Sequence, residues 1–245
     1  RRQMRYHITW ARISRTALFC LLLVAATAVV PRPAVAAPDV VTDIRPVHGL
    51  VAAIMDGAGA PVLIDESGGS PHAAALRPGS ARALQEADLF VWVGPQLTPW
   101  IARAADTLAR DAARVTLAEV PGTLRLPARP RGHGGGDPHA HGDAPLDPHL
   151  WLDPRNAAAW AEPIAAALAD ADPANATLYA ANAEALVADL AALEAELRAD
   201  LAPVADVPFA VLHDAFAYFE HRFALNSVGA LSLSAAAAPR PQGLR

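Results

Sequence analysis

This 245-residue sequence is very poor in cysteine and lysine. It contains no lysine, and its one cysteine, Cys20, lies in an apolar run near the amino terminus. Disulfide bonds and thiolate metal sites are therefore excluded from the rest of the chain. Positive charge is also scarce, because residues 37–245 hold 14 arginines against 25 acidic residues, a formal net charge of −11. An acidic surface argues against nucleic-acid binding and suits an exported protein that handles cations.

Residues 1–36 have the pattern of a secretory signal. Five arginines precede an apolar run over 17–30, and small residues lead to a cleavage point near Ala36-Ala37. The run is shorter than the ~20 residues that span a bilayer, which argues against a transmembrane helix. Cys20 follows the bulky Phe19, which is unlike a lipid-modified cysteine. We therefore expect export to the periplasm with the signal removed.

Strand-like and helix-like segments alternate after the signal. The pattern predicts strands over 40–44, 61–64, 89–93 and 114–117, and helices over 47–55, 80–87 and 99–113. This order implies a parallel sheet with helices on both faces. Residues 121–148 break the pattern, because they are rich in Pro, Gly, His and Asp and lack apolar periodicity. We expect them to form a long exposed loop.

Two Asp-Pro pairs open the helices that follow this loop. Asp153-Pro154 and Asp172-Pro173 each match an N-cap followed by proline at the first helical position, predicting helices over 154–170 and 173–203. The second helix places leucines 186, 190, 193, 197 and 201 on one face. A coiled coil is the alternative, but the seam is short for one, and we favour a long helix packed across the protein. A strand over 209–212, a helix over 215–223 and a strand over 227–233 then begin a second α/β lobe.

Three histidines stand at the ends of apolar stretches. They are His72 in Ser-Pro-His, His149 in Asp-Pro-His-Leu-Trp-Leu-Asp-Pro, and His213 in Val-Leu-His-Asp-Ala-Phe. Taken singly, His72 could be a solvated turn residue and His149 a loop residue before the next helix. Burying His213 after its apolar run costs free energy unless its ring nitrogens find partners. Imidazole is the commonest protein ligand for zinc, so the three together predict a zinc site, provided that the fold brings their segments to one place.

Three more histidines lie in the long loop, at His133, His139 and His141, beside Asp137 and Asp143. The plain interpretation is a disordered polar loop. Such a composition still favours weak, exchangeable metal binding, because mobile ligands lose entropy when they chelate an ion. We predict an auxiliary, low-affinity zinc-binding role for this loop.

The three histidine motifs resemble those of a known family. Ser70-Pro71-His72, the run from His149 to Pro154, and His213-Asp214-Ala215-Phe216 are similar, in this order, to the ligand motifs of periplasmic zinc-binding receptors of ABC-type zinc importers. These receptors form the metal-specific cluster of solute-binding proteins, and the likeness covers roughly residues 40–245. It implies a monomer that holds zinc, its transported ligand, between two lobes and delivers it to a membrane permease.

The fold class expected from pattern and resemblance is α/β, with two lobes of parallel sheet flanked by helices and joined by one long rigid helix. The first lobe covers residues 38–170, including the loop 121–148, the linking helix covers 171–204, and the second lobe starts at 205. The sequence begins at Arg1 rather than Met and stops at Arg245. We therefore expect a fragment whose second lobe is incomplete.

The fourth metal ligand and the choice of metal stay open to alternatives. Pro71 stands where some members of the family carry an acidic residue, and others use an acid from a later segment, so water is a further possibility. Zinc is favoured over manganese because an all-nitrogen set is softer than one with carboxylates. A surface adhesin on the same scaffold is another interpretation. A three-histidine zinc enzyme is disfavoured because no His-Glu-x-x-His pattern occurs, and Asp214 suits a helix cap better than a general base.

Overall fold

The computed structural model describes residues 37–64, 70–73, 75–129 and 145–232. Ala37–Arg245 form one compact unit. The signal over 1–36, the loop histidines 133, 139 and 141, and the last residues from 233 lie outside the described residues. Within the described ranges, no helix combines the length and the hydropathy needed to cross a bilayer.

A four-stranded parallel sheet organises the first part of the chain. Its strands are β1 (Val40–Thr42), β2 (Val62–Leu63), β3 (Leu89–Trp92) and β4 (Ala113–Thr116), in the order β2-β1-β3-β4. All three strand pairings are parallel. The prediction of a parallel sheet is confirmed, although each strand is slightly shorter than, or shifted from, its predicted range.

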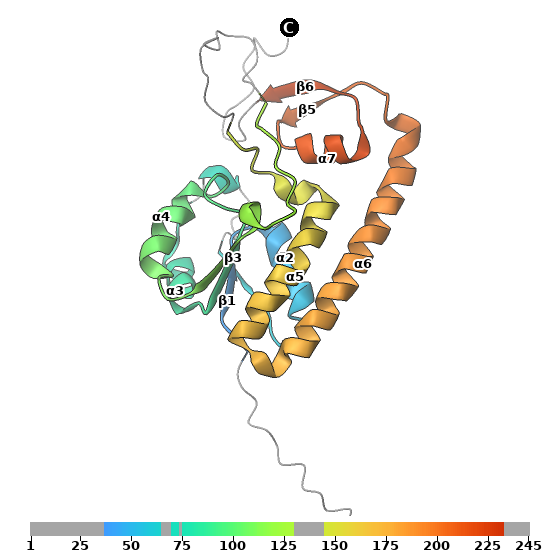
Figure 1. The fold of residues 1–245 in the computed structure, drawn as a ribbon. Coiled ribbons are helices and arrows are strands. Elements are labelled where there is room, and N and C mark those ends of the chain that lie inside the picture. Colours follow the sequence, from blue (N-terminus) through green and yellow to red (C-terminus); the bar gives the residue numbers. More distant parts are fainter. Residues whose placement is uncertain (1–36, 65–69, 74, 130–144, 233–245) are drawn as a thin grey trace, which may run out of the picture. The chain divides into compact units, whose positions relative to one another are not determined.

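Both faces of this sheet are covered by helices, as the fully buried strand β3 requires (Figure 1). Leu89 and Val91 point to a core that they share with α2 (Arg45–Ile54) and α5 (Pro154–Ala171). The alternate residues of β3 point to the other face, where α3 (Pro78–Glu86) and α4 (Pro99–Leu108) pack. This alternation follows from the two-residue period of a strand, and it fixes the sheet as the middle layer.

Helix α4 ends earlier than the sequence pattern predicts. The expected helix ran to residue 113, but the last helical residue is Leu108. The guanidinium of Arg114, at the start of β4, donates hydrogen bonds to the carbonyl oxygens of Ala105 (2.6 Å) and Ala109 (3.0 Å). The carbonyl of Ala105 also accepts the backbone N–H of Ala109 at 3.0 Å, so the side chain of Arg114 adds a second donor there and provides one for the carbonyl of Ala109, just past the helix end.

The 26-residue helix α6 (Ala176–Leu201) is the longest element, and it packs along α5 (Figure 1). A 3₁₀ turn (Pro173–Asn175) precedes it. The long helix is confirmed, but its predicted leucine face is only partly used. Leu186 and Leu190 pack against the core, whereas Leu193 is 43% exposed. The second half of α6 therefore runs beyond the main core.

Past α6, the chain forms a second, two-stranded parallel sheet. Strand β5 (Phe209–His213) leads through α7 (Ala217–Phe223) to β6 (Ser227–Ser232), and the two strands pair in parallel. Figure 1 shows these elements at the carboxyl-terminal end of α6. With both sheets parallel and flanked by helices, the predicted α/β class is confirmed.

Candidate metal centre

His72 lies in a 3₁₀ turn (Pro71–Ala73) between β2 and α3. The indole Nε1 of Trp100 on α4 donates a hydrogen bond of 2.9 Å to the carbonyl of Pro71, which fixes the turn against α4. The ring is half-buried, and burial is the main cause that lowers its pKa below the ordinary value of 6.5. The neighbouring rings of His149 and His213 lower it further by charge repulsion. A lowered pKa keeps the imidazole neutral, the form that binds metal.

His149 is buried just before the 3₁₀ turn (Leu150–Leu152) that leads into α5. Its Nδ1 lies 2.7 Å from Oδ1 of Asp147, and the same oxygen accepts the backbone N–H of His149 at 3.0 Å. The ring of Trp151 lies 5.4 Å from that of His149, edge toward face. Taken singly, the sequence motif allowed a loop residue here, whereas the ring is buried and hydrogen-bonded to Asp147.

His213 is the last residue of β5, and the chain turns from it toward α7. Its Nδ1 is buried and has no hydrogen-bond partner among the described residues. Burial lowers the pKa of His213 most, and His149 lowers it further, while Asp214 and Asp147 oppose the shift. A buried ring nitrogen without a partner costs free energy, and a bound metal ion offers one way to recover it.

The three histidines come together although 141 positions separate the first from the last. One ligand atom from each lies within 4.8 Å of the others, and in the described part of the chain no other group of His, Cys, Asp or Glu meets this geometry. The Nε2 atoms of His72 and His149 are 3.2 Å apart. Two nitrogens on one tetrahedral zinc, each at about 2.05 Å, are separated by about 3.3 Å. The spacing therefore suits a shared metal ion.

Ring orientation is also compatible with three nitrogens that face one point. The ring centroids are 5.2 Å (His72–His149), 5.3 Å (His149–His213) and 6.1 Å (His72–His213) apart, with interplanar angles of 78°, 77° and 70°. The near-perpendicular rings do not stack face to face, and one nitrogen of each lies within 4.8 Å of the others. The arrangement can hold a cation by nitrogen lone pairs.

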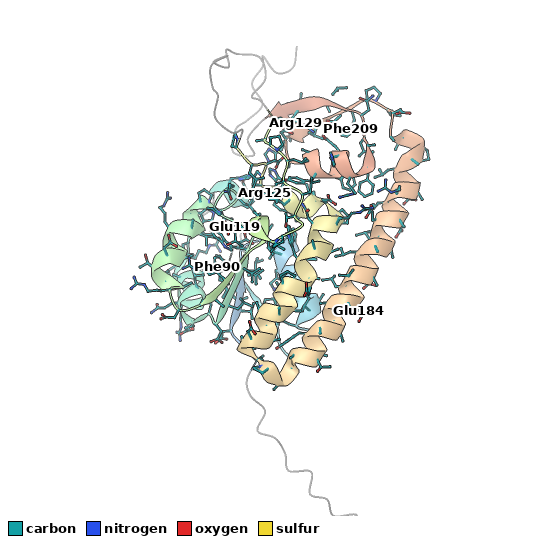
Figure 2. The ribbon with its side chains drawn as sticks, in the orientation of Figure 1. Phe90, Glu119, Arg125, Arg129, Glu184 and Phe209 are labelled. Atoms are coloured by element: carbon teal, nitrogen blue, oxygen red, sulfur yellow. The ribbon has the colours of Figure 1, made fainter. Side chains whose placement is uncertain are left out.

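Arg129 links the segment before His149 to the segment after His213. Its guanidinium forms ion pairs with Asp214 (2.9 Å) and with the buried Glu220 on α7. Figure 2 labels Arg129 beside the second sheet. The prediction of Asp214 as a helix cap was wrong, because Phe216 is the N-cap of α7 and the carboxylate of Asp214 pairs with Arg129 instead. No local sequence signal could have found this contact, because 85 positions separate the two residues.

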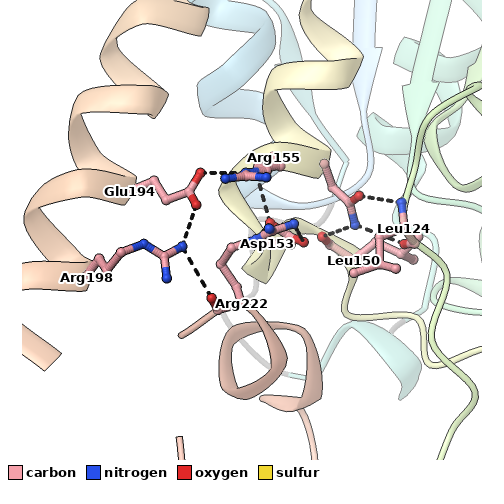
Figure 3. A network of polar contacts seen from close by, with 8 residues as sticks. Leu124, Leu150, Asp153, Arg155, Glu194, Arg198 and Arg222 are labelled. Atoms are coloured by element: carbon pink, nitrogen blue, oxygen red, sulfur yellow. Dashed lines mark hydrogen bonds and ion pairs between the residues drawn. The ribbon is translucent and has the colours of Figure 1, made fainter. Parts of the chain in front are cut away.

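A second polar network joins α5, α6 and α7 (Figure 3). Asp153 caps α5 by accepting the backbone N–H of Arg155 at 2.9 Å, and its carboxylate also binds the guanidinium of Arg222 through two contacts of 2.7 and 2.6 Å. On α6, Glu194 accepts from Arg155 and Arg198. The N-cap was predicted, whereas its ion pair with α7 was not. The network connects the motif of His149 to the helix that follows His213.

Residues 40–245 match the family described as the periplasmic component A of zinc-uptake complexes (ZnuA). The high-affinity zinc uptake system protein ZnuA of Paracoccus denitrificans is 40% identical over 253 residues, which cover 92% of this chain and 76% of that protein.

Solved structures give the same fold. A zinc-bound deletion mutant of ZnuA superposes with a TM-score of 0.69 at 25% identity, over 79% of this chain and 69% of that one. A mutant of the laminin-binding adhesin of Streptococcus agalactiae reaches a TM-score of 0.70 at 24% identity, over 84% of this chain and 74% of that one. At that identity the adhesin shares the fold, which does not discriminate between functions.

Proposed function

Since the chain belongs to the family of periplasmic components A of zinc-uptake complexes, we propose that it captures zinc in the periplasm and delivers it to the membrane permease of an ABC-type importer. The observation that carries the proposal is the meeting of three imidazoles from distant segments, with ligand atoms within 4.8 Å of one another. Zinc is the transported cargo in this proposal, and no covalent bond is made or broken.

We assign the ligands as His72, His149 and His213. Neutral imidazole nitrogen suits zinc, whereas manganese prefers oxygen donors. The described residues place no carboxylate in the candidate ligand group, which supports zinc over manganese. Water is our proposal for the fourth donor of a tetrahedral ion, because Pro71 precedes the first histidine and offers no ligand atom.

The two sheets are, in this proposal, the cores of two lobes over residues 38–170 and from 205 onward, linked by the helix over 171–204. The ligands come from both sides of that division, since His72 and His149 precede α6 and His213 follows it. Zinc would therefore bridge the lobes of a monomer. We further propose that residues 1–36 direct export and are removed near Ala36-Ala37, which amino-terminal sequencing of the periplasmic form would test.

Metal titration of the full chain tests the assignment. We expect one tight zinc site, with manganese unable to displace zinc at equal concentration. His149→Ala should weaken zinc binding by more than about 100-fold, since even residues that only orient a ligand cost about 10–100-fold when lost. His221→Ala is the matched control, because this exposed histidine of α7 lies outside the ligand group. Equal losses in both variants, or tighter binding of manganese, would contradict the proposal.

The loop histidines His133, His139 and His141 have, in our proposal, an auxiliary role that rests on composition alone. Deleting residues 132–143 should remove a weak second zinc equivalent in equilibrium dialysis and leave the tight site intact. An unchanged stoichiometry would count against the auxiliary role without affecting the main site.

A further inference from the structure

We propose that Asp147 and Tyr218 are positioning residues for zinc capture: Asp147 fixes which nitrogen of His149 faces the metal, and Tyr218 holds Asp147 in place. The inference rests on the proposed function and adds two residues to it that donate no atom to the ion. Both side chains are buried, and both contact the segment that carries the second ligand.

The first step concerns the tautomer of His149. A carboxylate only accepts hydrogen bonds, so the ring nitrogen that faces Asp147 at 2.7 Å must carry the proton. In a neutral imidazole the other nitrogen, Nε2, then holds the free lone pair. That atom lies 3.2 Å from Nε2 of His72, on the side where the ligand atoms meet. The contact thus leaves the lone pair on the nitrogen that faces the other ligands.

The second step concerns how Asp147 itself is held. The hydroxyl of Tyr218, on α7, donates to the carbonyl of Asp147 at 3.0 Å and accepts the backbone N–H of Leu126 at 2.9 Å. The backbone N–H of Asp147 donates to the carbonyl of Leu126 at 2.9 Å. One buried hydroxyl therefore joins the two chain segments on either side of the long loop.

Helix α7 also follows directly after the segment that carries His213. The contact between Tyr218 and Asp147 therefore relates the segment of His149 to that of His213. Two of the three ligands are thereby located relative to one helix. His213 is located through the chain, and His149 through Tyr218 and Asp147. If these contacts were only structural, they would stabilise the fold without selecting a tautomer of His149. Measuring the tautomer therefore separates a positioning role from a structural one.

The chain provides matched controls for both residues. Asp172 is also buried and accepts the hydroxyl of the buried Tyr179 at 2.9 Å, at the start of α6 and outside the ligand group. Asp172→Asn and Tyr179→Phe therefore make the same chemical changes as Asp147→Asn and Tyr218→Phe in a similar environment. Any effect on zinc binding that comes from general loss of stability should appear in the controls as well.

The experiment combines long-range ¹H–¹⁵N NMR of the histidine rings, zinc affinity by chelator competition, and urea unfolding of the metal-free full chain. In the unsubstituted protein, the His149 signal, identified by its loss in His149→Ala, should show the proton on Nδ1. Asp147→Asn should mix the tautomers and weaken zinc binding by about 10–100-fold. Tyr218→Phe should cost about fivefold, and the double variant no more than Asp147→Asn alone, because both act along one path.

Three results would overturn the inference. One is a His149 ring protonated on Nε2 in the unsubstituted protein, a result that needs His149→Ala only to identify the signal. Another is an unchanged tautomer and affinity in Asp147→Asn, and the third is an equal loss of affinity in the Asp172 and Tyr179 controls. If the unsubstituted chain failed to bind zinc, the proposed function would fall and this inference with it. If the unsubstituted chain binds zinc and Asp147→Asn binds it equally tightly, only the inference about Asp147 and Tyr218 fails.

Discussion

The surroundings of individual residues determine whether the three imidazoles can bind a metal ion. Burial is the largest cause that lowers the pKa of both His72 and His213, and the neighbouring histidines add to it. The motifs singled out the three histidines that the fold brings together, although the sequence left that convergence as a condition. They did not predict the contact between Asp147 and the ring of His149. The Asp-Pro-His spacing was its only local signal, and a spacing of two residues does not determine side-chain direction.

The lowered pKa values predict how binding depends on pH. Protons compete for the same lone pairs as zinc, so the affinity should be steady at neutral pH and fall as the solution is acidified toward the lowered pKa values of His72 and His213, which lie below 6.5. Metal-free stability should begin to fall earlier, between pH 6.5 and those lowered values. The unfolded chain takes up protons near pH 6.5, whereas the folded His72 and His213 resist them to lower pH. Chelator competition and urea unfolding from pH 7.5 to 4.5 would measure both effects, and a flat zinc affinity would refute this account.

At the scale of elements, α7 contacts two segments that are distant in the sequence. It places Tyr218 against the segment before His149, and Arg222 against the N-cap of α5. The start of α5 was readable in the sequence, because Asp153 caps it by a local hydrogen bond. The second Asp-Pro prediction was wrong in detail, because Asp172 makes no side-chain cap, a 3₁₀ turn follows it, and α6 begins at Ala176. Contacts between α7 and α5 were not, since 69 positions separate Asp153 from Arg222 and many arginines could have paired with that carboxylate.

Arg222→Met should strongly destabilise the protein. It would leave the fully buried carboxylate of Asp153 without its charged partner, and breaking a buried pair in this way costs about 3–5 kcal/mol. Arg82→Met is the matched control, because Arg82 pairs with Glu86 on the exposed surface of α3, where such a pair contributes about 0–1 kcal/mol. Urea unfolding of the metal-free forms would compare them. Similar losses of unfolding free energy in the two variants would show that the buried pair contributes no more stability than the exposed pair.

At the scale of the whole molecule, α6 connects two sheets that share no strand pairing. The order of strands and helices was sufficient to predict the α/β class, because alternation fixes a parallel sheet. The sequence predicted the leucine face of α6 but not which of its leucines pack against the core. Leu193 is exposed because the main core extends only along the first half of the helix, and sequence periodicity marks a face without saying how far its partner extends.

Zinc should stabilise the whole fold, because its proposed ligands come from segments that the unfolded chain does not hold together. At a free concentration 100 times the dissociation constant, the gain is about 2.7 kcal/mol. For a domain of this size that corresponds to a rise in Tm of about 5–10 °C. Thermal unfolding with zinc, and again after a chelator is added, would measure it. His149→Ala should show little of the rise, and a full rise in that variant would place the ion elsewhere.

The indole of Trp151 lies next to the ring of His149, one of the three proposed ligands. Indole fluorescence responds to charge in its immediate surroundings, so the arrival of a dication beside this ring should alter the emitted light. The intrinsic tryptophan fluorescence should therefore report zinc binding at the proposed site, and filling of the site could be followed in real time without any attached dye.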